Sequence, residues 1–490
     1  SAGWMAAAYL RKVLPETFAV TLVESPRVGA IGVGEGTIPI IRELVELLGL
    51  KERDWMTACQ ATFKLGIRFN DWAEPGRSWW HPFYFKHPRY PEKQIVDSWL
   101  EHRQRGQSAF QDPASLQHGC MSWQLAKGNR VPRYLASYGD FEQWDSDHAF
   151  HFDAHLFGQC LKEHAVDAGV VHIVDHVVDA VLSGDGAVKS IVTEEHGQIA
   201  GDFFLDCTGF RRLLMSAVSS ANFISFHQQL LCDAAVTLAV PYQDPGVEMR
   251  PYTVATAHSS GWIWQISLFH RVGFGYVYSS QHLDKDAAER ELRTFVGRER
   301  SAELEARHLK FCAGRLETPW VKNCVAIGLS EGFVEPLEAT SLGVTQHHLR
   351  ELASILNRAV DAPALARYNS AVAAIYEEVK QFLVSHYCLT KRRDTPFWRD
   401  VAQIESPVIP REQFAPAGHS MAVRHAVFAP QSWTCLAAGF DRAAAPLLRQ
   451  VNASVLSMDE LIEAQRSQQR VLQGFVRQFE FLKSIRHPHA

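Results

Sequence analysis

The chain has 490 residues, 47% hydrophobic and 21% charged, which is the composition of a globular protein with up to about three domains. Its formal net charge of -5 gives no reason to expect nucleic acid or an anionic membrane as a partner. No apolar run is long enough to span a bilayer, and Ser1 does not open a signal peptide. The nine cysteines are scattered without a C-x-x-C pair, which predicts reduced thiols, a cytoplasmic protein and no metal site.

The first two dozen residues predict a helix followed by a strand. Residues 4–14 have alanines and spaced apolar residues, and residues 18–23 form an apolar, β-branched run that we expect to be a buried parallel strand. Gly3 and Glu24 are separated by about 20 residues, the spacing between a dinucleotide fingerprint and its ribose-binding acid. The first strand and the first two glycines of that fingerprint are not in the sequence, so Gly3 takes only the third position.

A glycine-rich segment and a lone lysine follow. Residues 32–39 read GVGEGTIP, and glycines there let the backbone approach a ligand closely because no Cβ intervenes. The apolar run of residues 61–67 contains a single lysine, Lys64. Such a lysine either packs its stem on the surface with a solvated head or is a buried, specifically placed amine. The run by itself leaves both interpretations open.

Aromatic residues gather at two places. Residues 79–85 read WWHPFYF, a segment that either packs in a core or lines a pocket, and His81 within it has no partner at metal-ligand spacing. Residues 233–280 alternate with a period of two, which predicts an antiparallel sheet inserted into an α/β core. Trp262 and Trp264 point to one face of a strand there, as a core pair or as the wall of a cavity.

Two further strand ends carry glycine-containing turns. Residues 203–205 lead into Asp206 and the sequence CTG, and residues 324–328 lead through Gly328 into the loop LSEGFVEPLEATS. Both are places where backbone can approach a cofactor. Beyond about residue 365 the pattern is nearly all helical, with a last helix predicted over residues 458–485.

Ten segments, in this order, make the chain resemble the flavin-dependent halogenases of the tryptophan-halogenase type: AGWMAAAYL, GVGEGTIP, FKLGIRF, HFDAHL, DCTGFRRLL, GWIWQI, GFGYVYSS, NCVAIG, FVEPLEATS and DTPFW. The resemblance implies an α/β fold with an FAD-binding, doubly wound core of the glutathione-reductase type. It implies that this module covers residues 1–365, with the sheet of residues 230–280 inserted in it. Residues 366–490 are then a mostly helical, substrate-side subdomain packed on the module.

The resemblance also implies the chemistry. Family members receive reduced FAD from a separate flavin reductase, and oxygen adds to it to give a C4a-hydroperoxide. Chloride or bromide attacks this species, and the hypohalous acid formed travels through an internal tunnel to the substrate. The positions that match the family's cofactor segments are Gly3, Glu24, Gly32, Gly34 and Thr37, and at the two strand-end turns we expect Asp206 and Gly328 to border on the cofactor.

The matching motifs assign further roles. Lys64 in FKLGIRF corresponds to the essential amine, and Glu338 in EPLEATS corresponds to the other catalytic residue. The halide is expected against the backbone amides of Thr340 and Ser341. The family's flavin-side aromatics match Trp262 and Trp264. We expect the substrate pocket to be lined by His81, Phe83 and Trp433.

Two departures from the family pattern bear on the substrate and the fold. Ser267 stands where the tryptophan motif usually has a proline. Free-tryptophan halogenases carry an aromatic- and asparagine-rich lid that grips the amino-acid head group, whereas residues 428–440 here read FAPQSWTCLAAGF and contain no acid. The sequence therefore predicts a neutral, electron-rich arene of the indole type as substrate, with free tryptophan as the alternative.

Two other functions compete with this interpretation. A flavin monooxygenase would hydroxylate its substrate, would need no halide and would usually take NADPH itself. A flavin-binding protein that docks to a carrier protein would need an exposed basic or apolar face, and the sequence marks none. A homodimer is compatible with the sequence.

Overall fold

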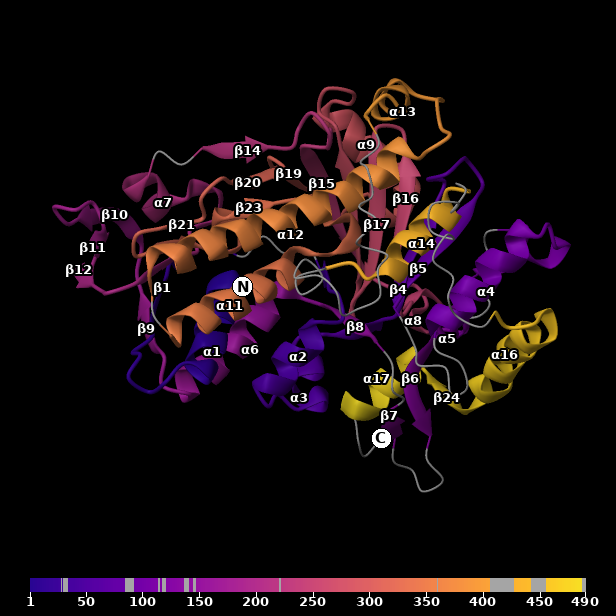
Figure 1. Ribbon diagram of the computed structural model, residues 1–490, viewed down its shortest axis with the longest axis horizontal. Helices are drawn as coiled ribbons and strands as arrows, with labels where there is room; N and C mark the ends of the chain where they lie inside the picture. Colours follow the sequence, from indigo (N-terminus) through magenta and orange to yellow (C-terminus); the bar gives the residue numbers. More distant parts are fainter. Residues whose placement is uncertain are drawn as a thin grey trace.

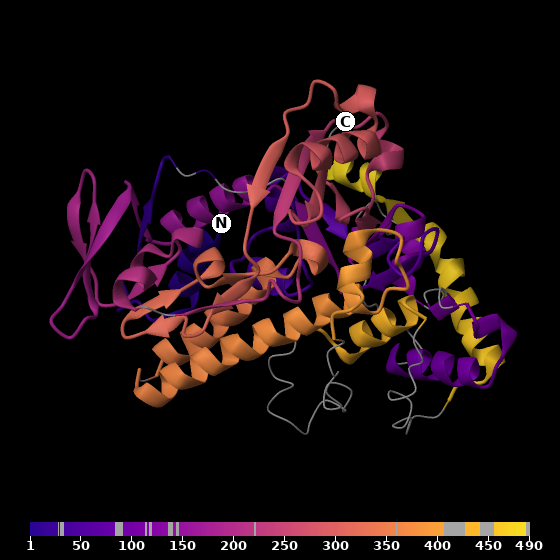
Figure 2. The ribbon, with the colours of Figure 1, turned by 90° about the horizontal axis from the view of Figure 1, so that it is seen from above.

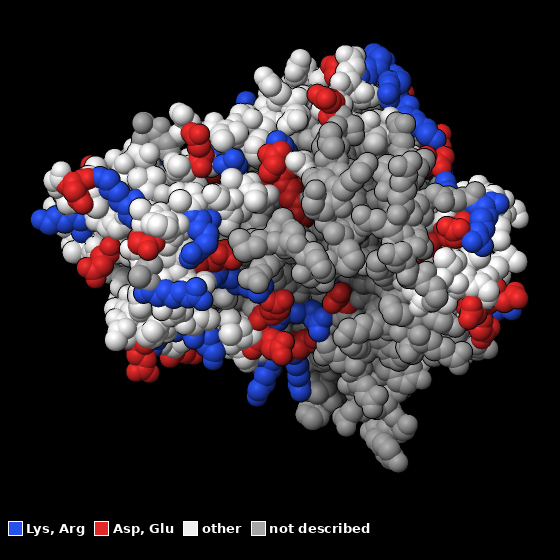
Figure 3. All heavy atoms as spheres, in the orientation of Figure 1, with Lys and Arg blue, Asp and Glu red and all other residues white. Residues whose placement is uncertain are grey.

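The computed structural model describes residues 1–27, 29, 34–83, 92–112, 115–116, 120–135, 141–143, 147–219, 222–358, 360–405, 427–441 and 455–486. Within them, no helix combines the length and the apolar character that crossing a bilayer requires. No disulfide joins any of the nine cysteines, all of which are among the described residues. The cytoplasmic location stays a prediction. On the face in Figure 3, Lys and Arg side chains are interspersed with Asp and Glu over the described surface, unlike the single-sign stripe of a nucleic-acid-binding face.

The amino-terminal part has the parallel strands and flanking helices of a doubly wound α/β core, which confirms the predicted fold class. Helix α1 (Ala2–Val13) is rich in alanine, which favours helix, and packs against α6 (Ala154–Asp167). Strand β13 (Phe204–Asp206) pairs in parallel with β22 (Cys324–Ala326). These strands end at the two glycine-containing turns singled out in the sequence.

The strand predicted over residues 18–23 differs from the expectation. It is β1 (Thr21–Glu24), which pairs in parallel with β9 (Val171–Val174), and Phe18 before it is 36% exposed. The prediction that this strand is buried was wrong, because β1 and β9 form a sheet of their own in the described chain. Each strand then has a single neighbour and remains partly exposed to solvent.

The predicted antiparallel sheet is present and is larger than expected. Its seven strands include two from the segment just after Lys64, so the sheet is not made by the inserted residues alone. Strand β4 runs parallel to β16, with Ile67 opposite Thr253. In spatial order the strands are β19 (Arg307–Lys310), β15 (Ala234–Val240), β18 (Val272–Tyr278), β17 (Gly261–Ser267), β16 (Thr253–His258), β4 (Gly66–Asn70) and β5 (Ser78–Pro82).

A small three-stranded sheet brings together segments that are far apart in the sequence. Strand β8 (Ala149–Phe152) lies between β2 (Glu35–Gly36) of the glycine-rich segment and β3 (Thr62–Lys64). Residue His151 of β8 is opposite Gly36 on one side and Thr62 on the other. The GVGEGTIP, FKLGIRF and HFDAHL motifs therefore meet at this sheet.

Two long helices cross the molecule. Helix α11 (Ser341–Leu356) begins at the last residue of the EPLEATS motif, and α12 (Ala362–Cys388) runs from the short strand β21 (Trp320–Val321) to the seven-stranded sheet (Figures 1 and 2). Position 365, where we expected one module to end, lies in the first turn of α12. The buried residues of α12 belong to the same hydrophobic core as those of α1. The division into modules at this position stays a prediction.

The last predicted helix is interrupted. Residues 458–485 contain α16 (Met458–Val471), then β24 (Phe475–Arg477), which pairs with β6 (Arg130–Leu135), and then α17 (Gln478–Arg486). The side chain of Gln478 is buried, and its Oε1 accepts a hydrogen bond from the backbone N–H of Phe63 at 3.0 Å. Pairing and burial against distant segments override the local helical pattern here.

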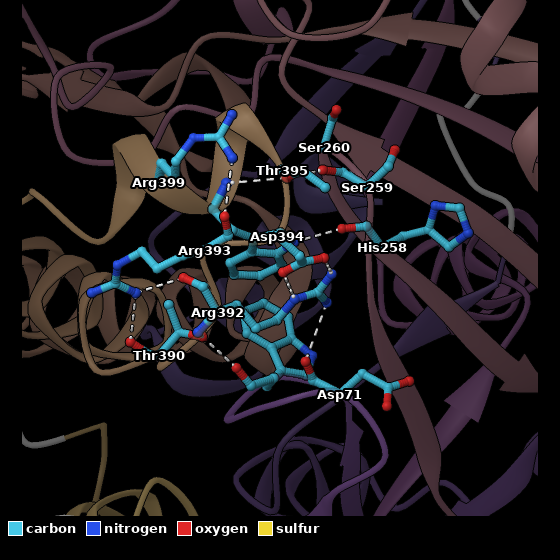
Figure 4. A network of polar contacts seen from close by, with 12 residues as sticks. Asp71, His258, Ser259, Ser260, Thr390, Arg392, Arg393, Asp394, Thr395 and Arg399 are labelled. Carbon is cyan, nitrogen blue, oxygen red and sulfur yellow. Dashed lines mark hydrogen bonds and ion pairs between the residues drawn. The ribbon is translucent and has the colours of Figure 1, made fainter.

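The segment after α12 fastens the end of that helix to the seven-stranded sheet (Figure 4). Arg392 donates to both carboxylate oxygens of Asp394 and to the backbone carbonyl of Asp71, which follows β4. The hydroxyl of Thr395 donates to the carbonyl of Ser259, in the turn between β16 and β17, at 2.7 Å. These contacts fix the carboxyl end of α12, which carries two residues of the site described below.

The remaining helices and strands complete the layers around these sheets. They are α2 (Ile41–Leu47), α3 (Glu52–Ala58), α4 (Glu92–Gln104), α5 (Met121–Lys127), β7 (Phe141–Gln143), β10 (Val177–Leu182), β11 (Val188–Thr193), β12 (Gly197–Ala200), α7 (Leu213–Val218), β14 (Phe223–Ser225), α8 (Pro245–Glu248), α9 (Lys285–Val296), α10 (Arg298–Ser301), β20 (Gly314–Leu316), β21 (Trp320–Val321), β23 (Gly332–Phe333), α13 (Pro396–Val401) and α14 (Pro430–Gly439).

Candidate active site

Lys64, the last residue of β3, is fully buried. Its Nζ donates a hydrogen bond to the backbone carbonyl of Thr37 at 2.8 Å and lies 5.2 Å from the centre of the Phe83 ring. Burial lowers the pKa of the amine from 10.5 to about 7, although the charge of Glu338 opposes this shift. Of the two interpretations that the sequence left open, the one with a solvated head is therefore wrong, and the role of the amine stays a prediction.

Glu338 is the second buried charge. It ends a short 3₁₀ turn (Pro336–Glu338), and the left-handed Ala339 that follows turns the chain toward α11. One carboxylate oxygen lies 2.9 Å from Nδ1 of His81, and the other lies 3.1 Å from Nε2 of His386. Burial alone would raise the pKa of Glu338, but the charges and hydrogen bonds of His81 and His386 outweigh it and lower the pKa to about 2.

His386 was not found from the sequence. It lies on the buried face of α12, and its Nδ1 donates to the carbonyl of Phe382 one turn earlier, at 2.8 Å. Nδ1 carries the single proton of the neutral imidazole. Nε2 and Glu338 therefore form a hydrogen bond only when a second proton is present, either on Nε2 or on the carboxylate. The single signal in the sequence was the spacing of Phe382 and His386, which places both on one helix face.

The residues predicted to hold the halide lie at the start of α11. Thr340 is the N-cap residue and Ser341 is the first residue of the helix, and Thr340 is buried. The first N–H groups of a helix have no carbonyl of an earlier turn to bond, and the helix dipole favours an anion there. The amides of both residues directly follow Glu338 and Ala339, so the structure is compatible with the predicted halide position, which stays a prediction.

An aromatic cluster borders on the Lys64–Glu338 pair. His81 and Phe83 contact the pair directly, and Trp433 joins the cluster through Phe382, with ring centres 4.8 Å apart. Phe382 also stacks on Phe428 at 3.8 Å and lies 5.6 Å from the His81 ring. The structure thus connects the three predicted pocket residues, and it adds Phe382 and Phe428, which the sequence did not reveal.

The two predicted flavin-side tryptophans are neighbours in β17. The ring centres of Trp262 and Trp264 are 5.9 Å apart, and both side chains are buried. Nε1 of Trp262 donates to Glu335 at 3.0 Å, and the hydroxyl of Tyr387 donates to the same oxygen at 2.6 Å. Burial raises the pKa of Glu335 to about 7, against the lowering effect of these two donors. Consecutive residues of α12, His386 and Tyr387, thus hold the two glutamates of the EPLE motif.

Three of the predicted cofactor positions meet at the amino end of α1. A Cβ added to Gly3 would lie 3.5 Å from Cβ of Cys207, which follows Asp206. Gly328 has a φ of +65°, and a Cβ there would lie 2.7 Å from that of Ala2. Backbone approaches this closely only because side chains are missing. A helix amino terminus beside such turns suits the phosphates of FAD, so the residues present fit that group.

The two acidic cofactor positions are both hydrogen-bonded within the protein. Glu24 accepts from Nε1 of Trp4 at 2.9 Å, and its other oxygen lies 3.2 Å from His172. Asp206 is fully buried, and its oxygens accept from its own turn, from Ser330 and from the first amides of α7. Its carboxylate therefore shapes the turn, which leaves the backbone of the turn to approach a cofactor.

The glycine-rich segment lies elsewhere. Thr37 Oγ1 exchanges hydrogen bonds with the backbone of Phe150 in β8, and a Cβ on Gly34 would lie 3.4 Å from the side chain of Leu268. Gly32 lies outside the described residues. The carbonyl of Thr37 accepts the hydrogen bond of Lys64. Contact of Gly34 and Thr37 with a flavin stays a prediction.

Both the sequence and the fold of the chain are similar to those of known proteins. The family profile named Tryptophan halogenase matches residues 1–453. Tryptophan 6-halogenase SttH of Streptomyces toxytricini is 41% identical over an alignment of 422 residues, with 82% of this chain and 79% of that protein covered. 7-Chloro-L-tryptophan 6-halogenase KtzR of Kutzneria sp. (strain 744) is 41% identical over an alignment of 420 residues, with 82% of this chain and 80% of that protein covered.

Solved structures show the same similarity. Tar14, a tryptophan C-6 flavin-dependent halogenase (chlorinase) from taromycin biosynthesis, superposes with a TM-score of 0.86 at 35% identity, covering 99% of this chain and 98% of Tar14. A hydroxylating monooxygenase is not favoured by these matches, and FAD and a halide are the reactants that they imply. A profile match over most of the chain, together with relatives above 40% identity, shows that this chain belongs to the tryptophan halogenase family and is a flavin-dependent halogenase.

Proposed function

We propose that the protein chlorinates or brominates a neutral, electron-rich arene of the indole type, with Lys64 and Glu338 as catalytic residues. The observation that carries this proposal is the fully buried Lys64 amine, which lies beside the ionised Glu338 and the aromatic cluster. When bound, reduced FAD supplies hypohalous acid from oxygen and halide. A separate flavin reductase supplies the reduced FAD.

Lys64 transfers the halogen. In its neutral form the amine lone pair forms an N–X bond as the O–X bond of hypohalous acid breaks, and water leaves with one amine proton. The arene then takes the halogen from nitrogen: a C–X bond forms as the N–X bond breaks, and the proton that the arene loses passes by way of Glu338 to the nitrogen, which restores the amine. Holding the halogen at one buried atom replaces a random encounter by a positioned one.

Glu338 takes the proton that the arene loses. A carboxylate with a pKa of about 2 is a weak base, but the cationic arene intermediate is a far stronger acid, so the transfer is downhill. The same negative charge stabilises that cation before it is deprotonated. Through His81 and His386 the carboxylate is held in one position.

The rate of halogenation is expected to fall below about pH 7. The neutral amine is the reactive form and the pKa of Lys64 is lowered to about 7, so the rate should rise through that pH and level off above it. Since the charge of Glu338 raises this pKa, the midpoint should move to lower pH in Glu338→Gln. The rate of product formation, measured across pH for the wild-type protein and for Glu338→Gln, checks both. A rate independent of pH from 5 to 9 (a range of about two pH units on either side of the midpoint) would contradict the role of the neutral amine.

Two acidic side chains near the aromatic cluster, Glu378 and Asp441, already have hydrogen-bond or ion-pair partners. Glu378 accepts the backbone N–H groups of Val427 and Phe428 at 3.1 and 2.9 Å. Asp441 lies 2.5 Å from Arg103 and 3.4 Å from Lys391. Since residues 428–440 contain no charged side chain, this segment offers no ionic partner to an amino-acid head group. Burying an unpaired charge is strongly disfavoured, which supports a neutral substrate.

Free tryptophan is the second candidate. The relatives above 40% identity are named as halogenases of tryptophan or of chlorotryptophan. Both candidates place an indole ring in the same aromatic cluster, so they share the assignment of Lys64 and Glu338.

Indole is expected to be halogenated with a higher kcat/KM than tryptophan, and at C3, where the ring itself is most reactive. A side-by-side measurement of both substrates, with product position determined by NMR, decides between the candidates. A clear preference for tryptophan, or attack at one fixed carbon of its benzene ring, would show that the head group is bound.

The protein is expected not to oxidise NADH without a reductase. A nicotinamide site would need its own glycine-rich strand–turn–helix, and the sequence shows no second one. NADH absorbance is followed with FAD, halide and indole present and the reductase left out. NADH consumption in step with product would contradict a separately supplied reduced flavin.

A further inference from the structure

A buried chain of hydrogen bonds leads from the end of β17 to the space beside Lys64. The hydroxyl of Thr62 is 2.6 Å from the carbonyl of Ser267 and 3.3 Å from Nδ1 of His151. The other ring nitrogen of His151, Nε2, is 2.9 Å from the hydroxyl of Thr253. Thr62 and His151 are fully buried and Thr253 is 5% exposed.

The direction of each hydrogen bond follows from its partners. A carbonyl only accepts, so the single hydroxyl proton of Thr62 points to Ser267, and Nδ1 of His151 must donate to Thr62. A neutral imidazole then has its lone pair on Nε2, which accepts the hydroxyl proton of Thr253. Burial lowers the pKa of His151 well below its usual value, and the charge of Lys64 adds to this. The hydroxyl oxygen of Thr253 therefore keeps its lone pairs for another donor.

That oxygen borders on the position left free by the missing side chain of Gly36. A Cβ added there would lie 3.5 Å from Nζ of Lys64, 3.6 Å from Oγ1 of Thr253 and 3.2 Å from Cβ of Ala339. The amine and the hydroxyl thus flank one small position, next to the residue that follows Glu338. A small molecule that contacts both groups would lie against the Gly36 backbone, in the space that a side chain there would narrow.

We propose that Thr253 is a second polar contact for hypohalous acid beside Lys64, and that His151 is a positioning residue that turns the acceptor side of the Thr253 hydroxyl toward that position. The inference rests on the proposed function. The O–H of hypohalous acid donates to Oγ1 of Thr253, so its halogen faces the amine of Lys64. The N–X bond then forms as the O–X bond breaks, and the oxygen leaves as water with its own proton and one amine proton.

The hydrogen bond from the O–H group of hypohalous acid to Thr253 fixes the orientation of the acid. Without the Thr253 hydroxyl the acid can present its oxygen to the amine as readily as its halogen, and it stays for a shorter time. Removal of the hydroxyl should therefore lower the amount of product only after hypohalous acid has formed, because more of the acid escapes without reacting. The rate of flavin oxidation should not change. Orientation of a reactant is worth far more than the strength of the single hydrogen bond that provides it.

Thr253→Val tests the inference, because valine has the shape of threonine without the hydroxyl. Product per reduced flavin should fall about tenfold or more, the effect of losing one well-placed hydrogen bond. A soluble β-diketone that traps free hypohalous acid should collect correspondingly more halogen. Thr253→Ser keeps the hydroxyl and should restore product per flavin to near the wild-type value. His151→Leu should lower product in the same way as Thr253→Val.

Gly36→Ala is a second variant that leaves the hydrogen-bond chain intact. Its methyl group would occupy the position between the amine and the hydroxyl, so it should also raise the trapped halogen and lower the product. A wild-type yield of product per flavin in Thr253→Val and in Gly36→Ala would overturn the inference. So would flavin oxidation that falls in parallel with product, since Thr253 would then only support the fold. If the wild-type protein makes no halogenated product, the proposed function itself fails.

Discussion

Lys64→Ala is expected to abolish halogenation of the arene and to leave flavin binding intact. Lys64 is the amine that borders on both Glu338 and the aromatic cluster, and nothing else on β3 can hold the halogen. The predicted cofactor positions Gly3, Asp206 and Gly328 meet at the amino end of α1, which is a different part of the fold from β3. Product is measured by mass spectrometry, and flavin binding is measured by the change in FAD fluorescence.

Two further variants make this result specific. Alanine leaves a cavity where Lys64 is buried, so Lys64→Met, which fills the space without an amine, should show the same loss of product. Lys51→Ala removes an exposed lysine at the start of α3 and should retain wild-type activity. Halogenated product at a wild-type rate from Lys64→Met would refute the assignment of the amine.

Glu338→Gln is expected to lower the rate of halogenation by roughly 10²–10⁴-fold, the effect of losing a positioned base. Glutamine keeps the shape of the side chain between His81 and His386, but it carries no charge and cannot accept the proton that the arene loses. The rate of flavin oxidation in the absence of halide should stay unchanged. Stopped-flow absorbance of the flavin and product analysis, done on the same samples, separate the two.

The exposed Glu46 of α2 offers a matched control. Glu46→Gln removes the same charge at the protein surface and should have no effect on either rate. Flavin oxidation that falls in parallel with product in Glu338→Gln would mean that Glu338 supports the structure and takes no part in the chemistry.

The helices and the large sheet could be predicted because their patterns are local. The alternation of residues 233–280 predicted strands, and α1 and α12 appear where the sequence predicted helix. The order of ten motifs predicted which residues would converge, and Lys64 is buried beside Glu338. Motifs carry this information because each one needs particular residues for the turn or contact that it makes.

Pairings between distant segments could not be predicted. His386 holds Glu338, and Thr253 meets His151, only because α12 and the strands β8 and β16 come together in the folded chain. Neither contact leaves a periodic signal in the sequence. For the same reason β24 was mistaken for helix, since its pairing with β6 lies more than three hundred residues away in the chain (Figure 1).

The presence of Ser267 in place of the family's proline has a structural consequence. Its hydroxyl accepts the backbone N–H of Arg250 at 3.0 Å, which ties the approach to β16 to the end of β17. Its carbonyl anchors Thr62 and hence the chain that ends at Thr253. The sequence marked position 267 as unusual. In the structure the serine hydroxyl at this position accepts a hydrogen bond from the backbone of Arg250.

One assay tests the central claim most directly. The protein is combined with FAD, a flavin reductase, NADH, indole, and either chloride, bromide or no halide, and the products are identified by mass spectrometry. We predict chloroindole with chloride, bromoindole with bromide and neither product without halide, all lost in Lys64→Met. An indole product that gains oxygen, formed equally with and without halide, would contradict the assignment of a halogenase site to Lys64 and Glu338.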